Sequence, residues 1–219
     1  MSTSDVYVET GDRRCFACSL EWPGWCRSGK TEGEALEALL AYAPRYALVV
    51  TAAGLRFPAR AQERADVVER VQGSMATDFG VPGLPAVADG QPLTRAGAAR
   101  LASLVAASWR ILDDVAAGAP ATLRKGPRGG GRDRDAIVTH VLEAEASYAR
   151  KLGLRRKVAT RGDADAVAAQ RDAILAVLRR PSDGTPVVEK GWPPRYAARR
   201  IAWHALDHAW EIEDKSEPA

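Results

Sequence analysis

The feature that most constrains the fold is a change of period near residue 94. From there almost to the end of the chain, apolar residues recur with the spacing of a helix, and the pattern is interrupted three times. Each resulting segment opens with a capping residue or an early Pro. The predicted helices span residues 94 to about 117, 133–152, 163–179 and 193 to about 215. Four consecutive helices indicate a four-helix bundle.

The first part of the chain has a different pattern. Residues 6–8 and 14–20 are candidate strands on either side of the turn signal Gly11-Asp12, which predicts a hairpin. Thr31 and Glu34 have the spacing of a capping box, so a helix should begin there. Residues 67–71 could form another strand, and 79–85 are typical of a loop. We therefore expect an α+β protein with a small mixed α/β domain at 1–92 and a helical bundle at 93–219.

Length, charge and cysteine content narrow the class of protein. The 219 residues suffice for one large domain or two small ones. A formal charge of +3 is too balanced to indicate a nucleic-acid-binding protein. No apolar run reaches the roughly 18–20 residues of a membrane span, and no signal peptide is recognisable. Together with three cysteines, an odd number that favours reduced thiols, this predicts a cytoplasmic protein. The sequence leaves open whether it forms a homo-oligomer.

All three histidines of the chain fall in the predicted bundle. His204 and His208 are four residues apart, so both imidazoles can point at one place. His140 lies on a face of its helix that should also turn inward. We predict that the three side chains hold a divalent metal ion and leave a coordination position open, as catalytic zinc sites do. The alternative is a core histidine and an unrelated polar helix face.

Imidazole ligands do not identify the metal, so we expect zinc first and nickel as an alternative. A bound ion lowers the pKa of a bound water or thiol. Ala205 stands where zinc proteases carry their general-base Glu, which disfavours that class.

Four other residues are candidates for contacts with an imidazole or with substrate. Arg200 and Glu211 fall near the direction of His204 and His208 on the helical wheel, and Ser147 falls near that of His140. Ordinary charge pairs on helix faces are the alternative. Arg132 belongs to a loop at 124–134, rich in Arg and Gly, which could bind an anionic co-substrate or be a solvated connection.

Two further groups of side chains are expected to pack rather than react. Trp203, Leu206 and Trp210 form a stripe away from the histidines, which should pack in the core or against the N-terminal part. Cys15 and Cys18 have a C-x-x-C spacing, but strand residues three apart point to opposite faces. With no fourth ligand near Cys26, we expect no metal site there.

At two places the sequence resembles known families. Residues 136–145, with His140, and 201–212, with the H-x-x-x-H pair, resemble the second and fourth helices of the DinB-like metalloprotein superfamily. This resemblance covers about 94–214. It implies a four-helix bundle with the three histidines as metal ligands. Residues 19–36 are similar to the start of HicB-like antitoxin domains, and this likeness covers about 6–46. It implies a small mixed α/β fold and nothing more.

The DinB-like resemblance also implies a function. Members include thiol-dependent S-transferases and a mycothiol-dependent maleylpyruvate isomerase. We therefore expect an enzyme that activates a low-molecular-weight thiol of the mycothiol type and presents it to an electrophilic small molecule, with hydrolysis as a variant. The competing hypothesis is a non-catalytic metal- or ligand-binding or regulatory protein with a HicB-like interaction module. A third is a bundle that has lost its metal.

Overall fold

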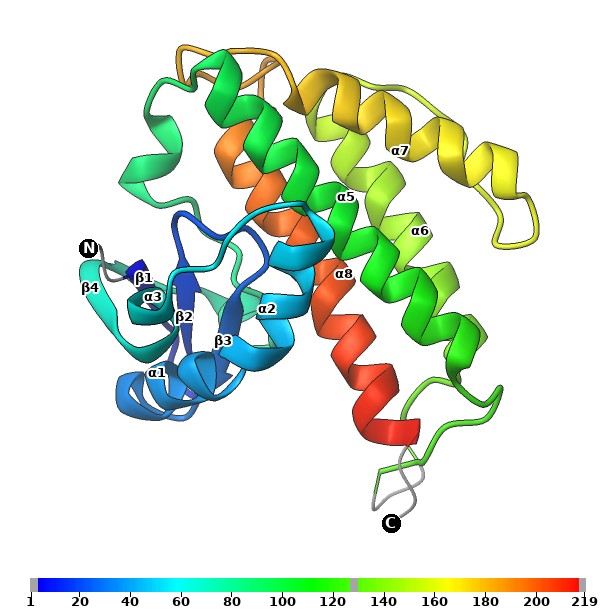
Figure 1. The fold of residues 1–219 in the computed structure, drawn as a ribbon, viewed down its shortest axis with the longest axis horizontal. Helices are drawn as coiled ribbons and strands as arrows, with labels where there is room; N and C mark the ends of the chain where they lie inside the picture. The colour runs from blue at the N-terminus through cyan, green and yellow to red at the C-terminus, as the bar shows by residue number, and fades with distance from the viewer. Residues whose placement is uncertain (1–3, 127–129, 217–219) are drawn as a thin grey trace.

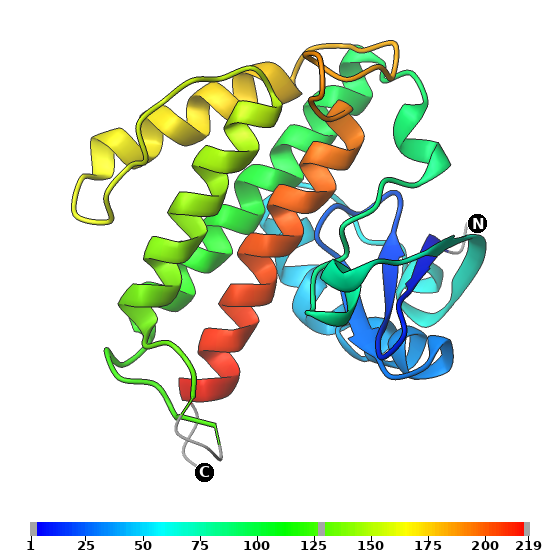
Figure 2. The same cartoon turned by 180° about the vertical axis from the view of Figure 1, so that it is seen from behind.

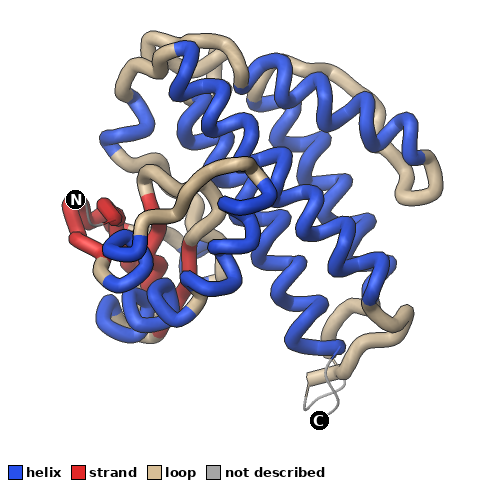
Figure 3. The backbone as a smooth tube through the Cα atoms, viewed as in Figure 1, coloured by secondary structure: helices blue, strands red, loops and turns tan. Residues whose placement is uncertain are grey.

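The computed structural model describes residues 4–126 and 130–216. Within these ranges the protein is mixed α+β, with one four-stranded sheet and eight α-helices (Figure 1). The sheet and its helices lie on one side of the molecule, and the long helices lie on the other (Figure 3). Both views of the ribbon show α8 between the other long helices and the sheet (Figure 2).

The four predicted helices of the bundle are confirmed, with ends within two residues of the predicted ones. They are α5 (Arg95–Gly118), α6 (Arg134–Lys151), α7 (Ala164–Leu178) and α8 (Pro194–Ser216). Capping side chains explain why the starts of α5 and α7 could be predicted from the sequence. Thr94 accepts a hydrogen bond from the backbone N–H of Gly97, and Asp163 accepts one from that of Ala166. The N-terminal end of α7 stands away from the other three helices (Figures 1 and 2).

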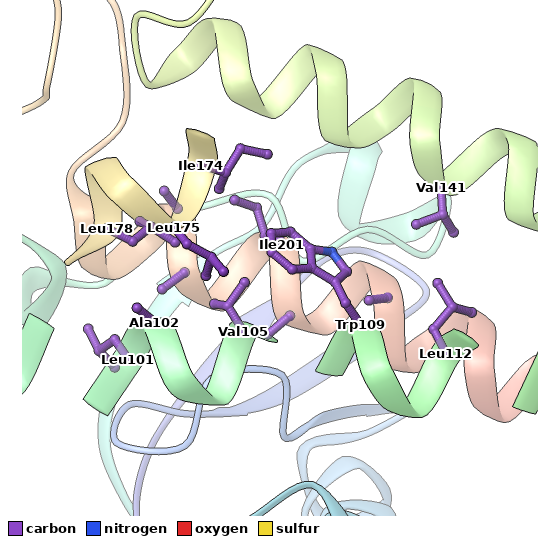
Figure 4. Close-up of a cluster of buried hydrophobic side chains, with 14 of the residues drawn as sticks. Leu101, Ala102, Val105, Trp109, Leu112, Val141, Ile174, Leu175, Leu178 and Ile201 are labelled. Carbon is purple, nitrogen blue, oxygen red and sulfur yellow. The ribbon is translucent and has the colours of Figure 1, made fainter. Parts of the chain in front are cut away.

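Apolar side chains from all four helices form the bundle core. Figure 4 shows Trp109 and Val105 of α5 facing Ile201 of α8, with Ile174 of α7 and Val141 of α6 nearby. These positions follow the helical period that the sequence displays. The core therefore fixes α6 and α8, the two helices that carry the histidines, in one packed unit.

The sheet has the order β3-β2-β1-β4. Its strands are β1 (Ser4–Thr10), β2 (Cys15–Ser19), β3 (Cys26–Gly29) and β4 (Ala65–Gln72). The predicted hairpin is confirmed as the antiparallel β1–β2 pair, and the predicted strand at 67–71 is confirmed as part of β4, which runs parallel to β1. The third strand, β3, pairs antiparallel with β2 and was not predicted.

Three helices lie between β3 and β4, and a fourth follows β4. They are α1 (Glu32–Ala41), α2 (Ala43–Ala52), α3 (Ala59–Glu63) and α4 (Met75–Asp78), followed by a 3₁₀ turn, η1 (Val87–Gly90). The predicted cap of α1 is confirmed: Thr31 accepts from the N–H of Glu34, and Glu34 accepts from that of Lys30. The loop at 79–85 is confirmed, whereas α2, α3 and α4 were not predicted.

The two parts of the chain share a core. Trp22, Trp25 and Tyr46 pack in one cluster with Leu206 and Trp210 of α8. The predicted role of the tryptophan stripe is thus confirmed, since Trp203 also packs against the sheet. Whether the divisions 1–92 and 93–219 are separate domains stays a prediction. No helix among residues 4–126 and 130–216 has the length and apolar character needed to cross a membrane.

Candidate metal centre

The helices α6 and α8 bring the three histidines together. One ring nitrogen from each of His140, His204 and His208 lies within 4.8 Å of the others. The ring centroids are 5.0 Å apart for His140 and His204, 5.1 Å for His140 and His208, and 4.7 Å for His204 and His208. The predicted convergence of the imidazoles is therefore confirmed. We call these three residues the histidine cluster.

The spacing of the nitrogens suits a shared cation. Nε2 of His204 lies 3.3 Å from Nε2 of His140. Nitrogens bound about 2.0–2.1 Å from a tetrahedral zinc ion would lie about 3.4 Å from each other. Without an ion the same separation suits one N–H···N hydrogen bond, which would leave His208 outside the pair. The donor set consists of three imidazoles, which fits zinc and nickel alike.

Burial favours the neutral form of two members of the cluster, His140 and His204. His204 and His208 are buried, and His140 is half-buried. Burial, followed by the charges of the neighbouring histidines, holds the pKa of His204 well below its usual value. The same causes lower the pKa of His140. Since only a neutral imidazole has a free lone pair for a metal, His140 and His204 are in their metal-binding form near pH 7.

A carboxylate orients one member of the cluster. Oε2 of Glu211 lies 2.7 Å from Nδ1 of His208, and Lys215 donates to the other carboxylate oxygen of Glu211. The hydrogen bond with His208 lowers the pKa of Glu211 to about 2. An ionised carboxylate accepts the Nδ1 proton of His208 and leaves its Nε2 free to bind a metal. The structure thus places Glu211 beside the cluster, as its position on the helical wheel predicts.

Arg200 also lies beside the cluster, one helical turn before His204. It is buried, and its Nη2 donates to the hydroxyl of Tyr148 at 3.3 Å. The ring of Tyr148 meets that of His204 edge to face, with centroids 5.7 Å apart, and also contacts Trp192. Tyr148 and Trp192 were missed by sequence reasoning. Tyr148 points about 80° away from His140 on the helical wheel and reaches the cluster by its length, while Trp192 precedes its helix and has no periodic signal.

Ser147 and Arg132 lie farther from the histidine cluster than Glu211 and Arg200 do. Ser147 is exposed on α6, donates to the carbonyl of Glu143 and accepts from Arg150, so no contact joins it to the cluster. Arg132 is exposed, and its charge contributes to lowering the pKa of His140 and His204. The part of the Arg/Gly loop at 127–129 lies outside the described residues. Substrate contacts by these side chains stay predictions.

The cysteines form no metal centre within the described parts of the chain, where the histidine cluster is the one group identified as able to hold an ion. Cys15 and Cys18 belong to different core clusters, as expected for opposite faces of β2. Cys18 faces Cys26 across the β2–β3 ladder, with sulfurs 2.6 Å apart. Sequence reasoning missed this contact because it did not recognise β3.

Neither the comparison with protein-family models nor those with curated proteins and solved structures finds a match. The helical bundle and the histidine cluster are compatible with a DinB-like site, and no family match confirms that relationship.

Proposed function

We propose that the protein is a metal-dependent enzyme of the DinB-like type, in which the histidine cluster holds a divalent ion, zinc first and nickel as the alternative. Its reaction would be the transfer of a low-molecular-weight thiol of the mycothiol type to an electrophilic small molecule, or an isomerisation that uses such a thiol. The observation that carries the proposal is the approach of three ring nitrogens to within 4.8 Å of one another.

An ion held by three imidazoles supplies Lewis acidity, an open position and a lowered pKa for a thiol or water bound there. The chain's own residues provide the rest of the arrangement. Glu211 holds the Nδ1 proton of His208 and fixes the orientation of its ring. The rings of Tyr148 and Trp203 both contact the buried ring of His204, with centroids 5.7 and 5.9 Å away.

A panel of thiols with chlorodinitrobenzene as the electrophile tests the proposal. The protein is purified without a His tag, and wild type is compared with His204→Ala, His208→Ala and Thr139→Ala. Thr139 is exposed on α6 next to His140, so it serves as the matched control. We expect turnover by wild type and by the control, and loss of turnover in both histidine variants. Equal turnover by all four proteins would contradict a catalytic role for the cluster.

The second candidate is a non-catalytic metal- or ligand-binding or regulatory protein with a HicB-like interaction module. The observation that favours it is the exposure of Met75, Phe79 and Val87 between β4 and α5, since large exposed apolar side chains often belong to interaction surfaces. This candidate predicts one bound ion per chain and no turnover with any thiol or electrophile of a broad panel.

A further inference from the structure

Three buried arginines of the bundle differ in how their charge is balanced. Arg199 pairs with the buried carboxylate of Asp89, and Arg171 pairs with Glu145. Arg200 is about as buried as these two residues: its exposed fraction is 8%, against 8% for Arg171 and 6% for Arg199. Unlike them, it pairs with no carboxylate among the described residues. A buried cation without a counter-ion is costly, so the fold is expected to keep one only where a ligand balances it.

The donors of Arg200 are also incompletely used. Nη2 donates to Tyr148, but Nε and Nη1 are buried with no hydrogen-bond partner among the described residues. The guanidinium carbon lies 4.7 Å from the ring centroid of Trp203 and 5.6 Å from that of Tyr148. These rings hold the group in place and offer it no acceptor apart from the Tyr148 hydroxyl. The guanidinium is therefore fixed in position, and its Nε and Nη1 groups remain free to donate to a ligand.

Arg200 also lines a cavity of about 10 Å³ with Cys18 and Cys26 on the side facing the sheet. A cavity of this size has room for about one water molecule. A single water can accept a hydrogen bond there but cannot balance the charge. A balancing anion therefore does not fit in this cavity, and the hydrogen bond of Arg200 to Tyr148, whose ring contacts His204, marks the other neighbourhood of the guanidinium.

That neighbourhood includes the histidine cluster. Arg200, His204 and His208 follow one another at four-residue spacing along α8, and Tyr148 contacts both Arg200 and His204. Glu211, the carboxylate on this stripe, is already engaged by His208 and Lys215. An ion in the cluster would add further positive charge close to Arg200, so the need for an anion would become greater.

We propose that Arg200 and Tyr148 form an oxyanion-binding site next to the histidine cluster, and that the molecule acted on there carries a carboxylate or a similar oxyanionic group. The inference rests on the proposed function in that it takes the cluster to be the reactive centre. It narrows the substrate class from electrophilic small molecules in general to small anionic ones. Arg suits this role because its planar fork matches carboxylate and phosphate oxygens.

The test uses Arg200→Met, which removes the charge and keeps most of the side-chain volume. Arg150→Met is the matched control, because Arg150 is exposed on α6 close to Tyr148. The thermal midpoint is measured for the full chain, with and without zinc, in acetate or phosphate against chloride at constant ionic strength. We expect Arg200→Met to have a higher midpoint than wild type in chloride, since an unpaired buried charge has been removed.

Acetate or phosphate should raise the midpoint of wild type and of the control in a saturating manner, and the apparent affinity should fall by about tenfold or more in Arg200→Met. Equal anion responses in wild type and Arg200→Met would overturn the inference, as would a wild-type midpoint that responds to neither anion. If the Met variant does not fold, Arg200→Lys is used to assign the Nε–H signal of Arg200 by NMR. That signal should shift on titration of wild type with the same anions, and a constant signal would overturn the inference.

Zinc content is measured on the same samples. Nickel is measured as well, and absence of both metals from wild type would defeat the proposed function, whereas normal metal binding without an Arg200-dependent anion response would defeat only the present inference.

Discussion

The turn at Trp22-Pro23-Gly24-Trp25 gives a quantitative test of how the N-terminal part packs on the helix that carries two of the histidines. The N–H of Trp25 donates to the carbonyl of Trp22, and Gly24 has φ +91°. Pro at the second position and Gly with positive φ at the third are the signature of a type II turn. A Cβ added to Gly24 would lie 2.7 Å from Cδ1 of Leu206 and 3.1 Å from the backbone carbon of Ala202.

We predict that Gly24→Ala lowers the free energy of unfolding by about 3 kcal/mol. Positive φ in a residue with a Cβ costs roughly 1–2 kcal/mol, and crowding a packed contact adds roughly 1–3 kcal/mol. For a chain of this size the loss corresponds to a fall of roughly 6–12 °C in Tm. The assay is urea denaturation followed by tryptophan fluorescence and circular dichroism.

Gly54→Ala is the matched control. Gly54 also has positive φ, at +71°, but an added Cβ meets nothing within 4 Å, so its substitution reports the backbone effect alone. A double-mutant cycle then combines Gly24→Ala with Leu206→Ala, which removes the side-chain atom nearest to the added Cβ. The double variant should be about 1–2 kcal/mol more stable than the sum of the single effects predicts. If Gly24→Ala costs no more than Gly54→Ala, the close packing of this turn on α8 is refuted.

Three further predictions concern charged groups. Asp89→Asn should lower the free energy of unfolding by roughly 3–5 kcal/mol because it leaves Arg199 buried and unpaired; a loss below about 1 kcal/mol in urea denaturation would contradict this. Glu211→Gln should weaken metal binding roughly 10–100-fold, measured by competition with a chelator, because His208 loses the carboxylate that orients it. Unchanged affinity would show that the contact has no such role. Finally, the pKa of His204 is lower in the folded than in the unfolded chain, so as pH falls His204 gains a proton first in the unfolded chain. The free energy of unfolding of the metal-free protein should therefore decline as pH falls below about 6.5, and the decline should end once the pH is below the pKa of His204 in the folded chain. His204→Ala should lack this component, and identical pH profiles for the two proteins would argue against it.

The sequence predicts the helical part well because its signals are local. The period of 3.6 residues and the caps at Thr94 and Asp163 need no knowledge of the rest of the fold. The approach of the histidines follows almost as directly. Helix geometry already pairs His204 with His208, and the inward face of α6 leaves His140 little freedom once the helices pack.

The features that were missed depend on contacts between distant segments. Strand β3 has four residues, including Arg27, Ser28 and Gly29, and shows no apolar alternation, so only pairing with β2 defines it. The contact between Cys18 and Cys26 follows from that pairing. The unbalanced charge of Arg200 is likewise invisible in the sequence, because a carboxylate from any other element could have paired with it.

The central claim is that three imidazoles share one cation, and metal stoichiometry tests it most directly. Wild type and His140→Ala are purified without a tag, dialysed against the same zinc-containing buffer and analysed for bound metal. We predict one divalent ion per wild-type chain, removable by a chelator with a fall in Tm, and loss of that ion from His140→Ala. A wild-type chain that retains no ion, with a Tm that the chelator leaves unchanged, would contradict the claim.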